Sequence, residues 1–207
     1  MEAFMKTSST KKVRQMVFLA MMSAIVVVLQ IICTFVKFGP FSITLALIPI
    51  IVGAALYGWK SGAFLGFVFG LTVYITGLMG LDGGFINLMM AYNPFLTTLL
   101  CFGKAIAAGA VAGALYAPIA KKNVFAGVLI SGIAAPITNT GIFALGMMTV
   151  FYGFLSQNSG DQLPLAALFL GWIGINFIIE LVVNVALGTV ITRIVAVASK
   201  NKSAFNY

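Results

Sequence analysis

Two ionisable residues, Lys104 and Glu180, lie in the middle of long apolar stretches of the sequence. In the hydrocarbon core of a bilayer a charged side chain costs at least about 2.5–3.5 kcal/mol, so such residues usually face a cavity or a partner. The Lys104 ammonium could hold a ligand carboxylate through a charge-assisted hydrogen bond. The alternative is an ion pair with Glu180 that serves only packing, and the sequence leaves both open.

Polar residues recur along the last apolar stretch. Asn176, Glu180 and Asn184 are spaced four residues apart, so they share one face of a helix, and Trp172 precedes them by one turn. Lipid offers these side chains no hydrogen bonds, which predicts that the face turns inward. We expect Trp172, Asn176 and Glu180 to contact a ligand and Asn184 to be structural. A hydrogen-bonded ladder that only holds the helices together is the alternative.

Three further positions are candidates for ligand contact. Asn139 follows Pro136 in an apolar stretch, where it could bind ligand or stabilise a kink. Tyr92 and Asn93 end a glycine-rich loop, which could cap a pocket and move when ligand arrives. A plain solvated connection is the alternative for that loop.

The composition requires a membrane to surround these residues. The chain has 207 residues, of which 61% are hydrophobic and only 8% charged, and its mean hydropathy is +1.11. A soluble domain has roughly 25% charged residues. The sequence therefore predicts an all-α integral membrane protein that forms one membrane domain over residues 1–207.

Six apolar segments are long enough to be considered as spans, each of which needs about 20 residues. They are expected at residues 13–36, 42–57, 61–78, 94–119, 124–151 and 165–198. Of the 12 basic residues, Lys37 would lie outside and Lys104 within the membrane, and all others on the opposite side. This bias predicts a six-helix bundle with both termini in the cytoplasm.

Several classes of function are excluded by missing residue types. The chain has no histidine, and Cys33 and Cys101 lie apart in apolar segments, so we predict no metal site and no cofactor. Neither a catalytic residue pair nor a glycine-rich phosphate loop ending in Lys-Ser/Thr is present, which argues against an enzyme and against an ATPase. The basic residues are scattered at segment ends and do not indicate nucleic-acid binding.

Small residues form two stripes. Ala20, Ser23 and Ala24 share a face near the inner end of the first segment, and this face could dock a partner or pack internally. A glycine recurs every fourth residue in the third segment, at positions 62, 66 and 70, and close packing against another helix of the bundle is the favoured interpretation there.

Taken in order along the chain, these features resemble the substrate-binding S component of an energy-coupling factor (ECF) vitamin transporter. The resemblance rests on residues 20–24, 39–44, 49, 53–58, 139–141 and 176–184 and on the glycine stripe. It implies a protein of the prokaryotic cell membrane that binds a vitamin with high affinity from outside. It further implies delivery through a transmembrane coupling subunit, docked at Ala20, Ser23 and Ala24, and two cytoplasmic ATPases.

Residues 41–49 and the polar face of the last segment are most similar to pantothenate-type members of that family. Pantothenate is a small anion with hydroxyls and an amide, which suits one lysine and several asparagines. Riboflavin or another vitamin is the alternative ligand. A function of a different class, a self-sufficient carrier or channel using Lys104 and Glu180 as a relay, is disfavoured by the lack of histidine and of an internal repeat.

Overall fold

The computed structural model describes residues 2–38, 41–42, 44–157 and 165–204, and helices make up nearly all of them. The helices are α1 (Glu2–Phe35), α2 (Leu47–Tyr57), α3 (Trp59–Leu78), α4 (Phe85–Tyr92), α5 (Pro94–Ala120), α6 (Val124–Thr149), α7 (Tyr152–Gln157), α8 (Leu165–Ala186) and α9 (Gly188–Ala204). Two short antiparallel strands, β1 (Lys37–Phe38) and β2 (Phe41–Ser42), connect α1 to α2.

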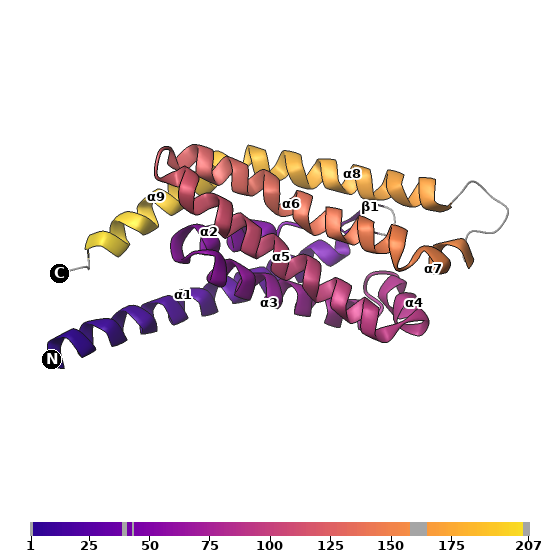
Figure 1. Cartoon of the computed structure of the whole chain (residues 1–207), viewed down its shortest axis with the longest axis horizontal. Helices are drawn as coiled ribbons and strands as arrows, with labels where there is room; N and C mark the ends of the chain where they lie inside the picture. The colour runs from indigo at the N-terminus through magenta and orange to yellow at the C-terminus, as the bar shows by residue number, and fades with distance from the viewer. Residues whose placement is uncertain (1, 39–40, 43, 158–164, 205–207) are drawn as a thin grey trace.

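The long helices form an elongated bundle (Figure 1). Each long helix packs against the next in the order α1, α3, α5, α6 and α8. The short helices α4 and α7 lie at one end of the bundle, whereas the N-terminal part of α1 and the C-terminal part of α9 extend from the other end (Figure 1). Helix α2 lies inside the bundle, where it contacts α3, α5, α6 and α9.

Most of α2 is buried because the helix is apolar on every side. Its residues Leu47, Ile50 and Ile51 are fully buried and form a core with Leu65 and Phe69 of α3. A helix that is hydrophobic all around is expected in such an interior position. This core holds in place the helices that bear the polar residues of the cavity.

The glycine stripe of α3 lets α5 approach at backbone distance. A Cβ atom at Gly62 or Gly66 would overlap with the carbonyl oxygen of Gly109 or Ala105, respectively, and one at Gly70 would lie 3.1 Å from the Cys101 carbonyl oxygen. The stripe therefore packs internally, as the four-residue spacing predicts. Small residues on facing helices allow the van der Waals contact that holds membrane helices together.

The structure confirms an all-helical protein but does not confirm the six expected spans. Among the described residues, four helices are long and apolar enough to cross a membrane, and the bent pair α8–α9 makes up to five. The segment expected at 42–57 yields only the 11-residue α2. A helix of that length extends about 16 Å, roughly half of a hydrocarbon core about 30 Å thick.

Two other expectations differ from the structure. The segment expected as one helix over 165–198 is bent by 48° between α8 and α9, where Gly188 follows the break. The expected loop at 79–93 contains α4, whose first turn is capped by Asp82: its carboxylate accepts hydrogen bonds from the backbone N–H groups of Gly84 (2.9 Å) and Ile86 (2.8 Å). A capped single helix of eight residues leaves little periodicity to detect in a sequence.

Candidate functional site

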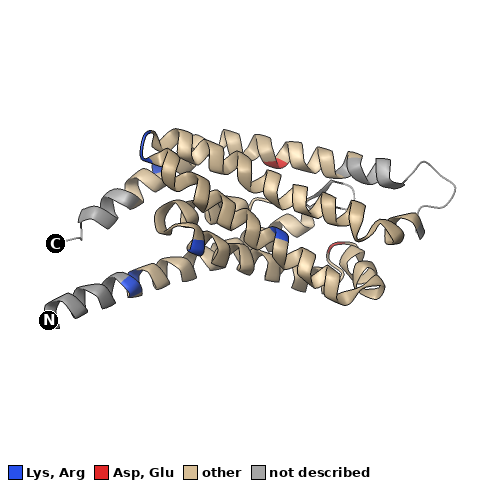
Figure 2. Cartoon of the chain, viewed as in Figure 1, with Lys and Arg blue, Asp and Glu red and all other residues tan. Residues whose placement is uncertain are grey.

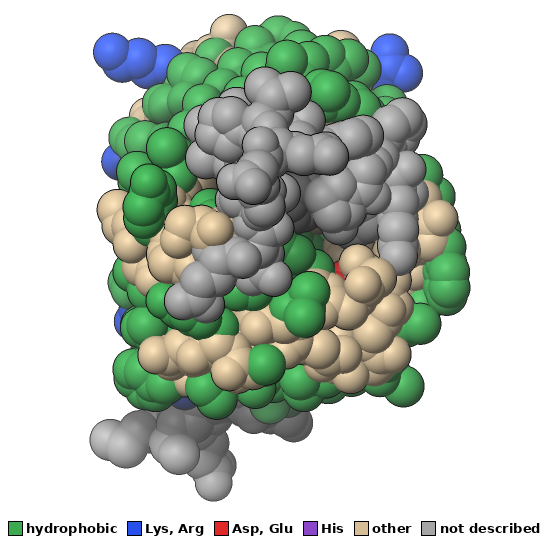
Figure 3. All heavy atoms as spheres, turned by 90° about the vertical axis from the view of Figure 1, so that its right-hand side faces the viewer, with side chains coloured by type: hydrophobic (Ala, Val, Ile, Leu, Met, Phe, Trp, Pro, Cys, Tyr) green, Lys and Arg blue, Asp and Glu red, His purple; other side chains and the backbone are tan. Residues whose placement is uncertain are grey.

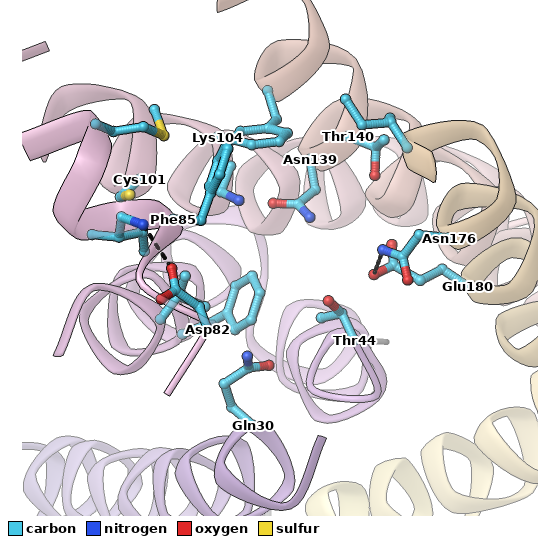
Figure 4. A pocket seen from close by; sticks show the side chains of 16 residues that line it. Gln30, Thr44, Asp82, Phe85, Cys101, Lys104, Asn139, Thr140, Asn176 and Glu180 are labelled. Atoms are coloured by element: carbon cyan, nitrogen blue, oxygen red, sulfur yellow. Dashed lines mark hydrogen bonds between the residues drawn. The ribbon is translucent and has the colours of Figure 1, made fainter. Parts of the chain in front are cut away.

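A cavity lies between the helices near the end of the bundle that carries α4. Its empty volume, which includes open space at the mouth, is about 850 Å³. The lining residues come from α1, α3, α4, α5, α6 and α8 and from the segments before α2 and α4; they are Gln30, Thr44, Phe69, Val73, Asp82, Phe85, Ile86, Met89, Cys101, Lys104, Asn139, Thr140, Phe143, Ile173, Asn176 and Glu180. Polar side chains thus converge from segments far apart in the sequence (Figure 4).

Seen from that end, the described surface has hydrophobic side chains around its perimeter and polar groups and backbone below its centre (Figure 3). An acidic side chain is visible there within a recess (Figure 3). The apolar perimeter suits contact with lipid, and the recess gives access to polar groups inside. The arrangement is that of a binding cavity within a membrane bundle.

Lys104 contributes the cationic group of the cavity. The residue lies ten positions after Pro94 at the start of α5, about 15 Å along the helix. Its Nζ lies 4.4 Å from the centre of the Phe143 ring on α6. In the part of the chain that the structure describes, Lys104 and Glu180 form no ion pair within 4.0 Å. A cation–π contact involves the face of a ring and not a hydrogen-bond acceptor, so the ammonium retains N–H donors for a ligand.

Glu180 and Asn176 of α8 form the opposite wall (Figure 4). Glu180 is only 1% exposed, and its Oε1 accepts a 3.5 Å hydrogen bond from Asn176 Nδ2. Glu180 Oε2 and Asn176 Oδ1 are buried without a partner among the described residues. Thr44, from the segment before α2, faces this wall. The spacing of polar residues along α8 therefore predicted correctly that Asn176 and Glu180 turn inward.

Asn184, one turn further along α8, does not line the cavity. It is 2% exposed, and neither atom of its amide has a partner among the described residues. The side chain lies beside Gly132 of α6. A Cβ atom added to Gly132 would be 4.0 Å from the Asn184 Cβ. The predicted structural role of Asn184 stays a prediction.

Asn139 lies between Lys104 and the α8 wall. Its side chain comes from α6, is 5% exposed and has an unpartnered Oδ1. Gln30 of α1 also reaches the cavity with an unpartnered Oε1. Gln30 was not predicted as a site residue, although a single polar side chain within an apolar segment is the same signal that identified Lys104.

Asp82 is the second acidic residue of the cavity. Its carboxylate is engaged by the two backbone N–H groups that begin α4, so the positive end of that helix offsets part of its charge. Phe85, the first residue of α4, contacts the rings of Phe143 (6.5 Å between centroids) and Phe154 (6.2 Å). Helix α4 thereby covers the cavity on the side of α7.

The other predicted site residues lie elsewhere. Asn93 caps α5, since its Oδ1 accepts a hydrogen bond from Leu96 N over 3.0 Å. Tyr92 packs on the rings of Phe151 and Phe154 at 5.9 and 5.8 Å and does not line the cavity. Trp172 belongs to α8, but its side chain lies outside the described residues.

The predicted docking face of α1 is directed away from the bundle. Ala20 and Ala24 are exposed, whereas Val26, on the opposite side of the helix, is fully buried. Ser23 is half-buried, and its hydroxyl donates to Leu19 O over 2.8 Å. The two alanines are thus available for contact with lipid or with another protein.

The family profile described as "ECF transporter, substrate-specific component" matches residues 14–192, which include every described residue of the cavity. The chain belongs to this family. The family is described as the substrate-specific component of a transporter, and the long apolar helices of the chain agree with a multi-pass membrane protein. This membership confirms the family resemblance seen in the sequence.

One curated protein is similar to part of this chain. The S component is 41% identical over 68 residues to the pantothenic acid transporter PanT of Lactococcus lactis subsp. cremoris (strain MG1363). The alignment spans 31% of this chain and 35% of PanT. The similarity therefore concerns about a third of each protein.

Proposed function

We propose that this S component captures pantothenate in the cavity between α5, α6 and α8 and delivers it through an ECF-type importer. The observation that carries the proposal is the cavity itself, where the Lys104 ammonium and several unpartnered buried oxygens meet inside a membrane bundle. Without a ligand these groups would be desolvated and uncompensated, which is costly. A small polar molecule that pairs with them is the simplest compensation.

The chemistry of the lining favours a small acid. Lys104 can donate to a carboxylate, while Asn139 and Asn176 can accept from or donate to an amide or hydroxyl. The partial similarity to PanT supports pantothenate among such acids. Riboflavin is a poorer candidate because an uncharged ligand would leave the Lys104 ammonium without an anionic partner.

The direction of capture follows from the distribution of charge. The lysines and arginines coloured in Figure 2 gather at the end of the bundle opposite α4 and α7, apart from one near mid-length on α5. Lys37, in β1, does not belong to that end (Figure 1). Cytoplasmic ends of membrane helices are enriched in these residues. Both termini are therefore proposed to be cytoplasmic, with the mouth of the cavity facing outward.

Delivery is proposed to require partners. Exposed Ala20 and Ala24, with Ser23 beside them, give a shallow surface on which a helix of a transmembrane coupling subunit could pack closely. Two cytoplasmic ATPases would bind that coupling subunit and supply the energy. The surrounding lipid covers the remaining apolar surface of the helices.

Titration calorimetry of the purified S component in detergent tests this proposal. Tight pantothenate binding without ATP or an ion gradient, together with weak or absent riboflavin binding, is the expected result. Uptake of pantothenate into liposomes by the S component alone would instead favour the self-sufficient carrier. Absence of binding to pantothenate would refute the proposed substrate.

A further inference from the structure

The wall of the cavity formed by α8 presents hydrogen-bond acceptors. Glu180 Oε2 and Asn176 Oδ1 are both buried and without a partner among the described residues. Asn176 Nδ2 donates to Glu180 Oε1, so this contact orients the amide and leaves its oxygen for a different donor. An ionised carboxylate can only accept hydrogen bonds. When Glu180 is ionised, the wall therefore requires donors from whatever occupies the cavity.

The opposite side of the cavity has the reverse character. Lys104 is a donor without acceptor capacity and approaches from α5, and Asn139 of α6 lies between it and the α8 wall (Figure 4). Asp82, also on the Lys104 side, already accepts two backbone hydrogen bonds from the start of α4. The cavity thus has a donor end and an acceptor end, separated by an amide that can do both.

We infer that Glu180 and Asn176 recognise a hydroxyl-bearing end of the ligand, while Lys104 holds its acidic end. The inference rests on the proposed function and deepens it, because it fixes the orientation of the substrate and names the residues that set specificity. Pantothenate has its carboxylate at one end, two hydroxyls at the other and an amide between them. Its three polar parts match the order of Lys104, Asn139 and the α8 wall.

Two hydroxyls suit this wall better than a single ligand ammonium. The two unpartnered oxygens belong to two different side chains, and each hydroxyl provides one donor directed at one of them. A ligand amine could nevertheless pair with the Glu180 carboxylate, so an amine-bearing analogue is one of the ligands to be compared.

The test measures the affinity of the full-length protein for three ligands by calorimetry. These are pantothenate, an analogue in which both hydroxyls are replaced by hydrogen, and an analogue in which an amine replaces the terminal hydroxyl. Removing both hydroxyls should weaken binding to the natural-sequence protein about 10- to 100-fold, as expected for hydrogen bonds to a charged group. Glu180→Gln should weaken pantothenate binding to a similar extent and leave the affinity for the dehydroxylated analogue nearly unchanged.

Lys104→Met is the matched comparison and should weaken binding of pantothenate and of its dehydroxylated analogue by the same factor. Equal losses for both ligands in Glu180→Gln, or no loss on removal of the hydroxyls, would overturn the inference. So would tighter binding of the amine analogue than of pantothenate. Should Glu180→Gln fail to fold, the comparison of the three ligands with the unsubstituted protein decides.

Failure of the proposed function would be seen separately, as no pantothenate binding to the unsubstituted protein. The small molecule that co-purifies with the protein, identified by mass spectrometry, then serves as the probe. A hydroxyl-bearing acid whose affinity falls in Glu180→Gln would support the inference. A ligand without hydroxyls, or no bound ligand at all, would overturn it.

Discussion

The close approach of α3 and α5 gives a quantitative prediction for the substitution Gly66→Ala. The added Cβ would lie well under 3.0 Å from the Ala105 carbonyl oxygen and 3.1 Å from the Ile106 Cα. Both are backbone atoms, which cannot rotate aside. Restoring an ordinary separation of about 3.5 Å requires the helices to move apart by roughly 1 Å.

Overpacking of this kind costs about 1–3 kcal/mol. The gain in helix propensity from glycine to alanine, about 1 kcal/mol, offsets part of that cost. The net loss of stability should therefore be up to about 2 kcal/mol, or a Tm up to about 8 °C lower, using the relation for chains of this size. Because Ala105 adjoins Lys104, the shift should also displace the ammonium and weaken ligand binding.

Thermal unfolding of the purified protein in detergent, with and without pantothenate, measures both effects. Gly103→Ala is the matched control, since it lies on α5 and no atom of another residue is within 4 Å of the added Cβ. The control should be at least as stable as the unsubstituted protein. Equal Tm values for Gly66→Ala and Gly103→Ala would refute the reasoning that backbone contact fixes this helix pair.

Three other substitutions test separate parts of the account. Lys104→Met should weaken pantothenate binding about 10- to 100-fold by calorimetry, because a charge-assisted hydrogen bond is lost. Ala24→Trp should abolish pantothenate uptake by the assembled transporter, yet leave the affinity of the isolated S component unchanged. Asp82→Ala should destabilise α4 by about 1 kcal/mol through loss of its cap, and amide hydrogen exchange over residues 85–92 should become faster.

Controls for these substitutions lie outside the cavity and the α1 face. Lys122→Met removes a charge from the turn between α5 and α6 and should not change affinity, so a loss equal to that of Lys104→Met would point to a general charge effect. Ile137→Trp places the same side chain at an exposed position of α6 and should preserve uptake. Loss of ligand binding in Ala24→Trp would mean that the face packs internally, and unchanged exchange in Asp82→Ala would mean that the cap contributes nothing.

The polar residues of the cavity were predicted best where a charge or a periodic pattern stood out against hydrocarbon. Lys104, Asn176 and Glu180 line the cavity because no lipid-facing position could accommodate them. The glycine stripe of α3 was equally informative, since only close helix packing explains glycine at every fourth residue. In both examples the membrane environment makes a local sequence pattern decisive.

Other features depend on tertiary contacts that no local pattern reveals. Gln30 reaches the cavity because α1 packs against α3, and Thr44 reaches it because the segment before α2 faces the α8 wall. Asn93, expected at the pocket, instead satisfies a backbone N–H at the start of α5, a role typical of asparagine before proline-led helices. The short α2 was overestimated because apolar length alone does not distinguish a buried half-span from a full one.

Mass spectrometry of small molecules released from the purified protein tests the central claim most directly. The claim is that the cavity between α5, α6 and α8 exists to hold a polar ligand and not merely to pair its own side chains. We predict that the unsubstituted protein, grown with pantothenate, releases this acid in near-stoichiometric amount and that Lys104→Met releases far less. A folded, monodisperse protein that releases no small molecule and binds none on addition would contradict the account.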